Sequence, residues 1–270
     1  MIPKIIHYCW FGGKEKPESV NKNIATWKKF CPDYKIIEWN ESNFDIAEND
    51  YCREAYEAHK WAFVSDYVRL KVLYKYGGIY MDTDVEVIQS LDEFLSYGAF
   101  SGYESENKIP TGTMGGCARN DWIGFLLSDY NTRHFKKIGG EEMFDTTTNT
   151  SVITRLTVEK YNLFLDGRMK IFGDNIAIFP VDFFCAKSPD TGKVCKTINT
   201  HTIHHFTSSW LPDNLKKKKS FRWWLVDVFG VVLGSIIFKI YDYPRHAKER
   251  ITQAFEKHVQ PFLYGRSKDY

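Results

Sequence analysis

The chain has 270 residues, of which 43% are hydrophobic and 26% charged, a composition typical of a globular protein and not of a disordered one. Its formal net charge of +2 is too small to indicate a nucleic-acid partner, and its length suits one large α/β domain with a small appendage. The six cysteines show no C-x-x-C pair and no finger-like spacing with histidine, which favours reduced thiols in a cytoplasmic protein over a disulfide framework.

The first elements in chain order predict a βαβ unit. Residues 5–10 are mostly apolar and predict a buried strand, and no long apolar core of a signal peptide comes before them. Residues 17–30 carry apolar side chains at helical spacing, and residues 34–39 predict a second strand. Strand, helix and strand at this spacing indicate an α/β sheet that binds a nucleotide.

The next segment carries two carboxylates to the end of a strand. Residues 57–76 predict one long helix, because apolar side chains recur along a stripe, and Gly77 is a natural residue to end it. Residues 79–81 predict a short strand that leads directly to Asp82 and Asp84. Two Asp residues one position apart suit a hard divalent cation, which takes oxygen ligands and often bridges substrate phosphates.

Asp66 and Arg69 precede this pair on the predicted helix. They are three positions apart, so they share a face and can point at the same site. Arginine suits two-pronged contacts to an anion or to hydroxyl groups, which lysine does not make as well. The alternative is an ordinary surface ion pair that contributes less than about 1 kcal/mol.

Asp82-Thr83-Asp84-Val85 has a rival interpretation, because it also resembles the D-x-D-x-[TV] nucleophile loop of haloacid-dehalogenase phosphatases. That loop should follow a buried apolar strand near the start of its domain. Here a Gly-Gly turn precedes the motif and a complete βαβ unit lies upstream, so the phosphatase interpretation is disfavoured. A D-x-D motif alone is a weak signal, and its context decides.

The later elements are less specific. Helices are predicted over 122–130 and 150–161, and strands over 176–179 and 202–206. The Gly-rich run 111–116 predicts loops around a pocket, and with the polar run 145–150 it is a candidate for contacts to the acceptor and the donor sugar. The alternative for both runs is plain surface loop.

The C-terminal part begins with a basic run at 216–219, followed by an apolar segment at 221–241 that contains Trp223, Trp224 and Asp227. Asp227 interrupts this segment, so its uninterrupted apolar length is shorter than the ~20 residues that span a bilayer. It is either a helix that packs on the core or a monotopic membrane anchor, and lysines followed by Trp-rich apolar sequence favour the anchor. We therefore predict a catalytic domain at 1–212 and a membrane-associated helical segment at 213–270.

Three blocks of the chain carry a family resemblance. The pattern Ala62-x-x-Ser65-Asp66-x-x-Arg69-x-x-x-Leu73-x-x-x-Gly77-Gly78-x-Tyr80-x-Asp82-x-Asp84 closely resembles the signature of glycosyltransferase family thirty-two. These are the DXD sugar-binding-region transferases, which include bacterial capsular-polysaccharide enzymes and fungal initiating mannosyltransferases. The opening block, 2–13, and the block His205-x-x-Ser208-x-Trp210 look like two further elements of that family, so the resemblance covers roughly residues 2–210.

The resemblance implies a GT-A fold (Rossmann-like, nucleotide-sugar-binding) and a retaining transfer from a nucleotide-diphosphate sugar, dependent on Mn²⁺ or Mg²⁺. For the donor, it implies that Trp10 stacks on the base, that Asp66 and Arg69 hold the sugar, and that Tyr80 and Asp82 contact ribose or sugar. For the metal, it implies that Asp84 binds the ion together with Asp82 and His205. Ser208 would complete the metal or diphosphate site, and Trp210 would cover the diphosphate. The large clostridial glucosylating toxins share the same element, and in them the position that matches His205 is a carboxylate, but histidine is a legitimate ligand of Mn²⁺.

The function expected from this resemblance is a hexosyltransferase that extends a surface polysaccharide such as capsule or O-antigen. Its acceptor would be a lipid-linked oligosaccharide at the cytoplasmic face of the cell membrane, and a uridine-diphosphate sugar is favoured as donor. One alternative is a nucleotide-sugar-binding protein that has lost turnover. Another is a toxin-like effector that glycosylates protein, which the membrane-like tail and the lack of a delivery segment disfavour.

Overall fold

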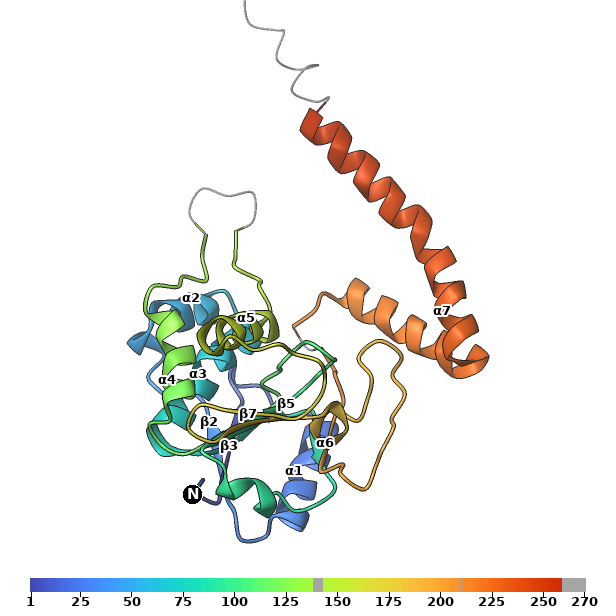
Figure 1. The fold of residues 1–270 in the computed structure, drawn as a ribbon. Helices are drawn as coiled ribbons and strands as arrows, with labels where there is room; N and C mark the ends of the chain where they lie inside the picture. The colour runs from blue at the N-terminus through green and yellow to red at the C-terminus, as the bar shows by residue number, and fades with distance from the viewer. Residues whose placement is uncertain (138–142, 209, 259–270) are drawn as a thin grey trace, which may run out of the picture. The chain divides into compact units, whose positions relative to one another are not determined.

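The computed structural model describes the backbone of residues 1–137, 143–208 and 210–258, and side chains as far as residue 242 (Figure 1). The chain divides into two compact units. The first comprises Met1–Pro189 and Val194–Trp210, and the second comprises Asp190–Lys193 and Leu211–Tyr270. The first unit contains the sheets, and the second contains the C-terminal helix.

A seven-stranded mixed sheet forms the centre of the first unit. Its strands, in order across the sheet, are β2 (Lys35–Trp39), β1 (Ile5–Cys9), β3 (Gly78–Met81), β6 (Thr113–Gly116), β5 (Ala99–Gly102), β8 (Ile176–Phe179) and β7 (Lys170–Phe172). Strands β2, β1 and β3 are parallel, whereas β6 is antiparallel to both of its neighbours. A second, two-stranded sheet pairs β4 (Val85–Val87) antiparallel with β9 (Thr202–His204).

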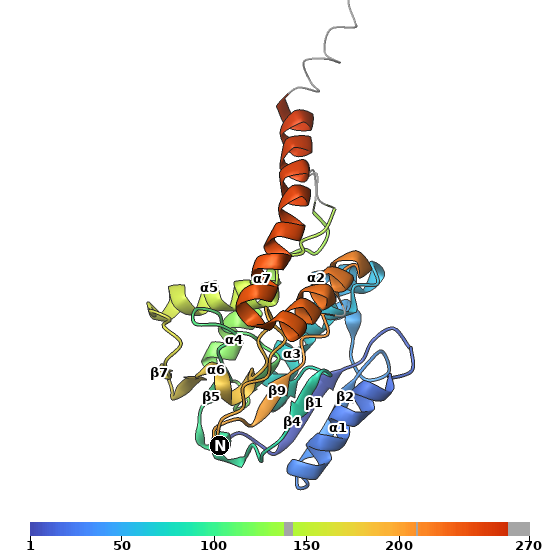
Figure 2. The ribbon, with the colours of Figure 1, turned by 90° about the vertical axis from the view of Figure 1, so that its right-hand side faces the viewer.

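Helices cover both faces of the large sheet. They are α1 (Glu18–Phe30), α2 (Asp50–Glu57), α3 (Trp61–Tyr76), α4 (Asp121–Ser128), α5 (Asn149–Tyr161) and α6 (Val181–Phe184), with short 3₁₀ helices at Ile46–Glu48, Asp92–Ser96 and Asp129–Asn131. Figure 1 shows α2 to α5 on one side of the sheet and α1 and α6 on the other, and Figure 2 shows α1 lying beside β4. This arrangement confirms the predicted α/β class, with the Rossmann-like first half expected of a GT-A fold.

The helix predicted over residues 57–76 is α3, which begins four residues later, at Trp61. Helix α2 ends at Glu57, and His59 adopts the left-handed region (φ 56), which turns the chain before α3 begins at Trp61. Helix α3 is buried on nearly all sides, from Phe63 to Leu73, because it lies between the sheet and the other helices of its layer. Asp66 and Arg69 are therefore in the interior, and an ordinary surface ion pair is excluded.

The end of α3 fixes the position of the D-x-D segment. Gly77 ends the helix with φ 65, and Gly78 follows with φ 106 at the start of β3. A Cβ at Gly78 would lie 2.7 Å from the carbonyl oxygen of Ile5 and 2.9 Å from Nε2 of His7, so only glycine fits there. The tight turn places β3 beside β1, in register with Ile79 opposite Ile6.

The Gly-rich run 111–116 was predicted as loop, but Thr113–Gly116 form the buried strand β6. The glycines are required by packing: a Cβ on Gly115 would lie 2.2 Å from Cε1 of Phe100, and one on Gly116 would lie 2.3 Å from Cδ1 of Ile123. Glycine in a strand often marks such a close approach, which sequence patterns do not distinguish from a flexible loop.

Among its described residues, the second unit contains one helix, α7 (Asp213–His258), which is interrupted by the non-helical residue Gly230. Its part Asp213–Asp242 is long and apolar enough by composition to cross a membrane. Only 17% of its most apolar 18-residue stretch is buried. This confirms the helical C-terminal appendage.

Candidate functional site

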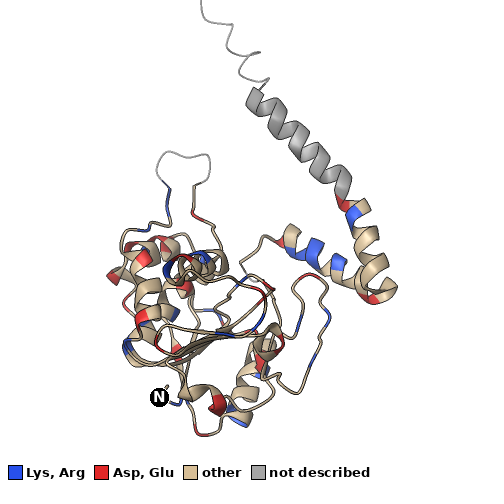
Figure 3. Cartoon of the chain, viewed as in Figure 1, with Lys and Arg blue, Asp and Glu red and all other residues tan. Residues whose placement is uncertain are grey.

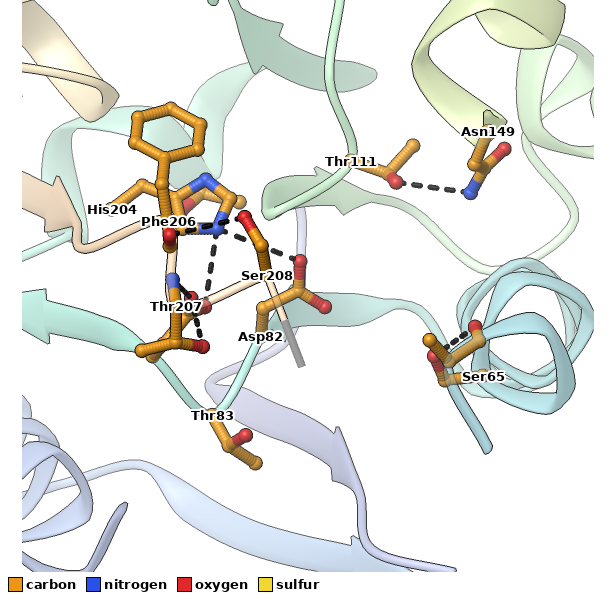
Figure 4. Close-up of polar contacts among 12 residues, drawn as sticks. Ser65, Asp82, Thr83, Thr111, Asn149, His204, Phe206, Thr207 and Ser208 are labelled. Atoms are coloured by element: carbon orange, nitrogen blue, oxygen red, sulfur yellow. Dashed lines mark hydrogen bonds and ion pairs between the residues drawn. The ribbon is translucent and has the colours of Figure 1, made fainter. Parts of the chain in front are cut away.

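The site begins where β3 ends. The backbone N–H of Asp82 donates to the carbonyl of Gly112 at 2.8 Å, which fixes the strand end against the loop before β6. Asp84 lies between β3 and β4, and its Oδ1 is 3.1 Å from Nε2 of His204 at the end of β9. The same imidazole nitrogen is 4.0 Å from Oδ2 of Asp82 (Figure 4). Two strand ends from distant parts of the sequence thus bring two carboxylates and one imidazole together.

The electrostatics of this cluster are those of a partly buried ion pair. Burial would raise the pKa of Asp84, but His204 and the hydrogen bonds from Thr207 hold that pKa well below its usual range. Thr207 donates to Oδ2 of Asp84 with its backbone N–H at 2.8 Å and its hydroxyl at 2.9 Å. Burial would lower the pKa of His204, but Asp84 raises it well above the usual value.

Asp82, Asp84 and His204 offer ligand atoms that all lie within 4.8 Å of one another. Two carboxylates and an imidazole suit a borderline cation such as Mn²⁺, so the donor set fits a divalent metal. An imidazole must be neutral to bind a metal, and the proton shared between His204 and Asp84 would then be released.

His205, predicted as the metal-ligating histidine, points elsewhere. Its Nε2 lies 3.0 Å from Oε2 of Glu86, while its backbone N–H donates to the carbonyl of Asp84. The reason is the alternation of side chains along a strand: His204, opposite Val85 in the small sheet, lies beside Asp84, so the next side chain, His205, points to the opposite face, where it pairs with Glu86. Thr202 and Ile203 before His204 are both buried, so burial along this strand gives no signal that favours His204 over His205.

The segment after His204 has an unusual backbone. Phe206 and Ser208 both adopt the left-handed region (φ 53), which is rare for residues other than glycine and is often found at functional sites. The ring of Phe206 stacks on the His204 imidazole with centroids 4.1 Å apart, and the Ser208 hydroxyl donates to the Phe206 carbonyl at 3.2 Å. Trp210 is largely exposed. The turn therefore holds His204 and Thr207 against Asp84.

A second polar group lies on α3. Arg69 is fixed by Ser65, whose carbonyl accepts from Nε and whose hydroxyl accepts from Nη2, both at 3.0 Å. Its Nη2 is 3.0 Å from Oδ1 of Asp66, and its Nη1 donates to the hydroxyl of Thr111 at 2.6 Å. Every one of these groups is buried or nearly so, which fixes the guanidinium in a single orientation.

Asn149, the first residue of α5, completes this group (Figure 4). Its side-chain amide donates to Oδ1 of Asp66 at 3.1 Å and to the hydroxyl of Thr111 at 3.0 Å. Its Oδ1 is buried and has no hydrogen-bond partner among the described residues. A buried acceptor without a partner is costly, so this oxygen is available to a hydroxyl group of a ligand. Thr111 and Asn149 come from the two runs, 111–116 and 145–150, that the sequence marked as candidates for contacts to the acceptor and the donor sugar, with plain surface loop as the alternative.

Asp66 has a perturbed acidity. Burial raises its pKa to about 6, and nearby Asp82 adds to the rise, whereas Arg69 and the hydrogen bond from Asn149 oppose it. A buried carboxylate with a raised pKa beside a fixed cation is typical of a binding or catalytic site.

Tyr80 and Arg69 join the two groups. The Tyr80 hydroxyl donates to Oδ1 of Asp82 at 3.1 Å, and the Arg69 guanidinium lies over the Tyr80 ring, 4.7 Å from its centroid. Nη2 of Arg69 is also 3.4 Å from Oδ1 of Asp82. The D-x-D pair and the Asp66–Arg69 pair are therefore parts of one continuous site.

Trp10 follows β1 and is half-buried. Its Nε1 donates to the carbonyl of Lys14 at 2.6 Å, and the Lys16 ammonium lies 5.9 Å from its ring. Because β1 and β3 are parallel neighbours, Trp10 and Asp82 leave the sheet at the same edge.

Lys187 adds a cation near the carboxylates: burial lowers its pKa, and Asp84 opposes that shift. Carboxylates, lysine and arginine in this arrangement suit a ligand that carries phosphate and hydroxyl groups.

Comparisons with known proteins agree with this chemistry. Residues 17–101 match the family model described as a glycosyltransferase sugar-binding region containing a DXD motif. Inositol phosphoceramide mannosyltransferase 3 of Schizosaccharomyces pombe is 34% identical over 122 residues, 42% of this chain and 33% of that protein. Mannosyl phosphorylinositol ceramide synthase SUR1 of Saccharomyces cerevisiae is 28% identical over 145 residues, 51% of this chain and 36% of that protein.

The chain spans about a third of the length of these curated relatives. Among solved structures, the PaToxG glycosyltransferase aligns with 59% of this chain and 69% of its own, at 21% identity and a TM-score of 0.46. The sequence comparisons support a glycosyltransferase, through the region that contains Asp66, Arg69, Asp82 and Asp84.

Proposed function

We propose that this chain is a metal-dependent, retaining glycosyltransferase that moves a sugar from a nucleotide-diphosphate sugar to an oligosaccharide carried on a lipid. The observation that carries the proposal is one continuous site, in which Arg69 lies between the cluster of Asp82, Asp84 and His204 and the pair Asp66 and Asn149. The match of residues 17–101 to a DXD sugar-binding region supports the same chemistry.

Asp82, Asp84 and His204 would hold the cation, and the imidazole favours Mn²⁺ over Mg²⁺. When bound, a divalent cation offsets the negative charge that develops on the diphosphate leaving group. The chain contributes fixed groups around it. Thr207 holds Asp84 in place through two hydrogen bonds, and Ser208 and Trp210 belong to the same closing segment, beside the expected diphosphate.

The donor sugar would be held by the buried polar group on α3 and α5. Ionised Asp66 accepts hydrogen bonds from sugar hydroxyls, Arg69 donates them, and the unpaired Oδ1 of Asn149 accepts one more. Trp10 would stack on the base at the end of β1. A retaining transfer of this kind relies on positioning and electrostatics, and Arg69 and Asp66 are held in fixed orientations before the donor binds.

The donor and the acceptor belong to the proposal as well. We favour a uridine-diphosphate sugar as donor and a lipid-linked oligosaccharide of capsule or O-antigen as acceptor, used at the cytoplasmic face of the cell membrane. The names of the relatives support an acceptor with a lipid part, because they describe mannose transfer to inositol phosphoceramide. A donor panel must therefore include mannose as well as glucose, galactose and N-acetylhexosamines.

The proposal is tested by donor hydrolysis and donor binding across uridine- and guanosine-diphosphate sugars with Mn²⁺. We expect turnover of one donor that is lost on chelation and falls by at least about a hundredfold in Asp84→Asn. The matched control is Asp33→Asn, which makes the same chemical change at a side chain that is 77% exposed, and it should keep full activity.

The remaining outcomes separate the alternatives. Donor binding without turnover would indicate a nucleotide-sugar-binding protein. Turnover with transfer to protein, and none to lipid-linked oligosaccharide, would indicate the toxin-like alternative. Folded protein that binds no donor would contradict the proposal as a whole.

A further inference from the structure

The first part of α7, residues 213–242, folds back on itself as a helical hairpin, named here the C-terminal hairpin. Gly230 has φ 80 and ψ 168, outside the helical region and in a conformation that other residues rarely adopt. A Cβ at Gly234 would lie 2.5 Å from the carbonyl oxygen of Leu225 and 2.7 Å from Cα of Val226. The second arm therefore packs directly on the backbone of the first.

Contacts at the other end hold the two arms together. The rings of Phe221 and Tyr241 have centroids 5.0 Å apart, and Nζ of Lys218 lies 2.6 Å from Oδ1 of Asp242. These pairs join the early part of the first arm to the late part of the second. Both ends of the hairpin therefore lie on the same side, opposite the turn at Gly230.

Neither arm is long enough to cross a bilayer. At ~1.5 Å per residue, the arm 213–229 is about 25 Å long and the arm 231–242 about 18 Å, and the first includes a charged start. The hydrocarbon core of a bilayer is about 30 Å thick. A single straight span over 213–242 would require Gly230 to become helical and the arm contacts to break.

The hairpin exposes an unusual amount of apolar surface. The exposed side chains include Trp224, Val228, Val231, Val232, Ile236 and Ile240, along both arms and around the turn. Val232 beside the turn is 75% exposed. Exposed apolar surface of this extent marks a surface that binds a lipid or a partner.

The charges of the hairpin identify the partner. Residues 216–219 are four consecutive lysines near the start of the first arm, and Figure 3 shows basic residues in blue along this arm. Basic residues beside an apolar helix with tryptophan match a membrane surface with anionic lipids. A second copy of the hairpin would bring another lysine run instead, which repels the first.

The charged groups nearer the turn limit the depth of insertion. Asp227 pairs with Lys193 at 2.9 Å, and Arg222 pairs with Asp190 at 2.9 Å, so both are engaged by the loop Asp190–Lys193 of the same unit. One side of the hairpin is therefore polar and ion-paired close to the turn. Such a polar side favours the boundary of headgroups and acyl chains over the bilayer centre.

From these observations we infer that the C-terminal hairpin inserts into one leaflet of an anionic lipid bilayer, and that both of its arms leave on the side from which they entered. The inference does not depend on sugar transfer, because it is carried by the turn, the exposed apolar side chains and the lysine run. It gives the monotopic anchor that the sequence favoured a specific form, a hairpin within one leaflet.

Vesicle flotation of the full chain tests the binding. We expect binding to vesicles of phosphatidylcholine with phosphatidylglycerol that is about tenfold stronger than binding to phosphatidylcholine alone. Val232→Glu should weaken it about tenfold or more. The matched control is Ile198→Glu in the first unit, the same kind of change at a side chain that is 89% exposed, and it should bind as the parent does. Equal losses in both variants, or no binding to anionic vesicles, would overturn the inference.

Thiol labelling tests the topology in a Cys195→Ser background, which removes the exposed native thiol. Cysteine is introduced singly as Asn214→Cys, Lys239→Cys or Val232→Cys, and vesicle-bound protein is treated with a membrane-impermeant maleimide. We expect fast labelling at 214 and 239 and protection at 232. Protection of 239 with labelling of 214 would mean that α7 crosses the bilayer. Self-association lost in Val232→Glu, without vesicle binding, would mean that a second copy covers this surface; either result overturns the inference.

Discussion

Single side chains decide the chemistry of the candidate site, and two of them differ in role although they are adjacent. His204 lies between Asp82 and Asp84, whereas His205 is paired with Glu86 on the outer face of the small sheet. The geometry thus favours His204 as the metal-ligating histidine, one position before the His205 expected from the family resemblance. The physical cause is the two-residue period of a strand, which gives neighbouring side chains opposite faces.

This assignment predicts unequal effects of two matched variants. His204→Gln should weaken Mn²⁺ binding and lower donor hydrolysis by about 10- to 100-fold, because the imidazole is lost from beside both carboxylates. His205→Gln should change Mn²⁺ binding and donor hydrolysis by less than about threefold, since the His205 side chain pairs with Glu86 and not with Asp82 or Asp84. Titration calorimetry with Mn²⁺ and initial rates on the same preparations measure the two quantities. A larger loss in His205→Gln would restore the original assignment.

Asp66 predicts an acid limb in the pH profile of donor turnover. The burial that raises its pKa to about 6 leaves it increasingly protonated below that pH, and a protonated carboxyl loses acceptor capacity for sugar hydroxyls. We expect kcat/KM to fall as the pH falls through about 6. In Asn149→Ala the hydrogen bond that lowers the Asp66 pKa is absent, so the limb should move to higher pH.

The control for this profile is Asn107→Ala, which removes an exposed asparagine from a surface turn and should leave the limb in place. An unchanged limb in Asn149→Ala would mean that another group titrates there.

At the scale of elements, the site depends on close approaches that only glycine permits. Strand β6 lies flush against Phe100 and Ile123, and Gly112 before it passes the His204 ring so closely that a Cβ would lie 2.8 Å from Nδ1. These contacts place Thr111 beside Arg69 and the Gly112 carbonyl over Asp82. The glycine-rich run is therefore a packed part of the site. Its glycines look like a flexible loop in the sequence, and for that reason it was not recognised as a strand.

Gly115→Ala should destabilise the protein by about 1–3 kcal/mol, because the new methyl overlaps the ring of Phe100 in a close-packed core. Urea unfolding of the chain measures the loss. Phe100→Leu alone should also destabilise, but combined with Gly115→Ala it should recover part of the loss, since the smaller side chain makes room. Strictly additive losses in the double variant would contradict this packing account.

At the scale of the whole molecule, His7 connects three elements. It lies in β1 with both ring nitrogens engaged: Nε2 is 2.8 Å from the Gly77 carbonyl at the end of α3, and Nδ1 accepts from Nε1 of Trp39 in β2 at 3.0 Å. This pattern requires the neutral ring with its proton on Nε2. Burial lowers the pKa of His7 to about 4, although the hydrogen bond to Gly77 opposes the shift.

The lowered pKa of His7 predicts an acid-sensitive fold. The unfolded chain protonates near pH 6.5 and the folded chain only near 4, so the contribution is fully present above pH 6.5 and is lost as the pH falls toward 4. At pH 5 the loss from this group is about 2 kcal/mol of unfolding free energy. Urea unfolding at pH 7.5 and 5, with a chelator present, should show a smaller change in His7→Gln than in the parent. Equal changes would show that His7 does not titrate this way.

Local spacing was enough to predict the βαβ start, the strand that ends in Asp82 and Asp84, the shared helix face of Asp66 and Arg69, and the apolar C-terminal helix. Which distant groups meet could not be predicted in this way, because it depends on how the elements pack. The pairing of β4 with β9 selected His204 over His205, and the burial of α3 made Asp66 and Arg69 internal. The fold also brought Thr111 and Asn149 to Asp66, and Gly230 turned one apolar helix into a hairpin. Contacts between residues far apart in the chain leave no periodic pattern in the sequence, so they follow from packing alone.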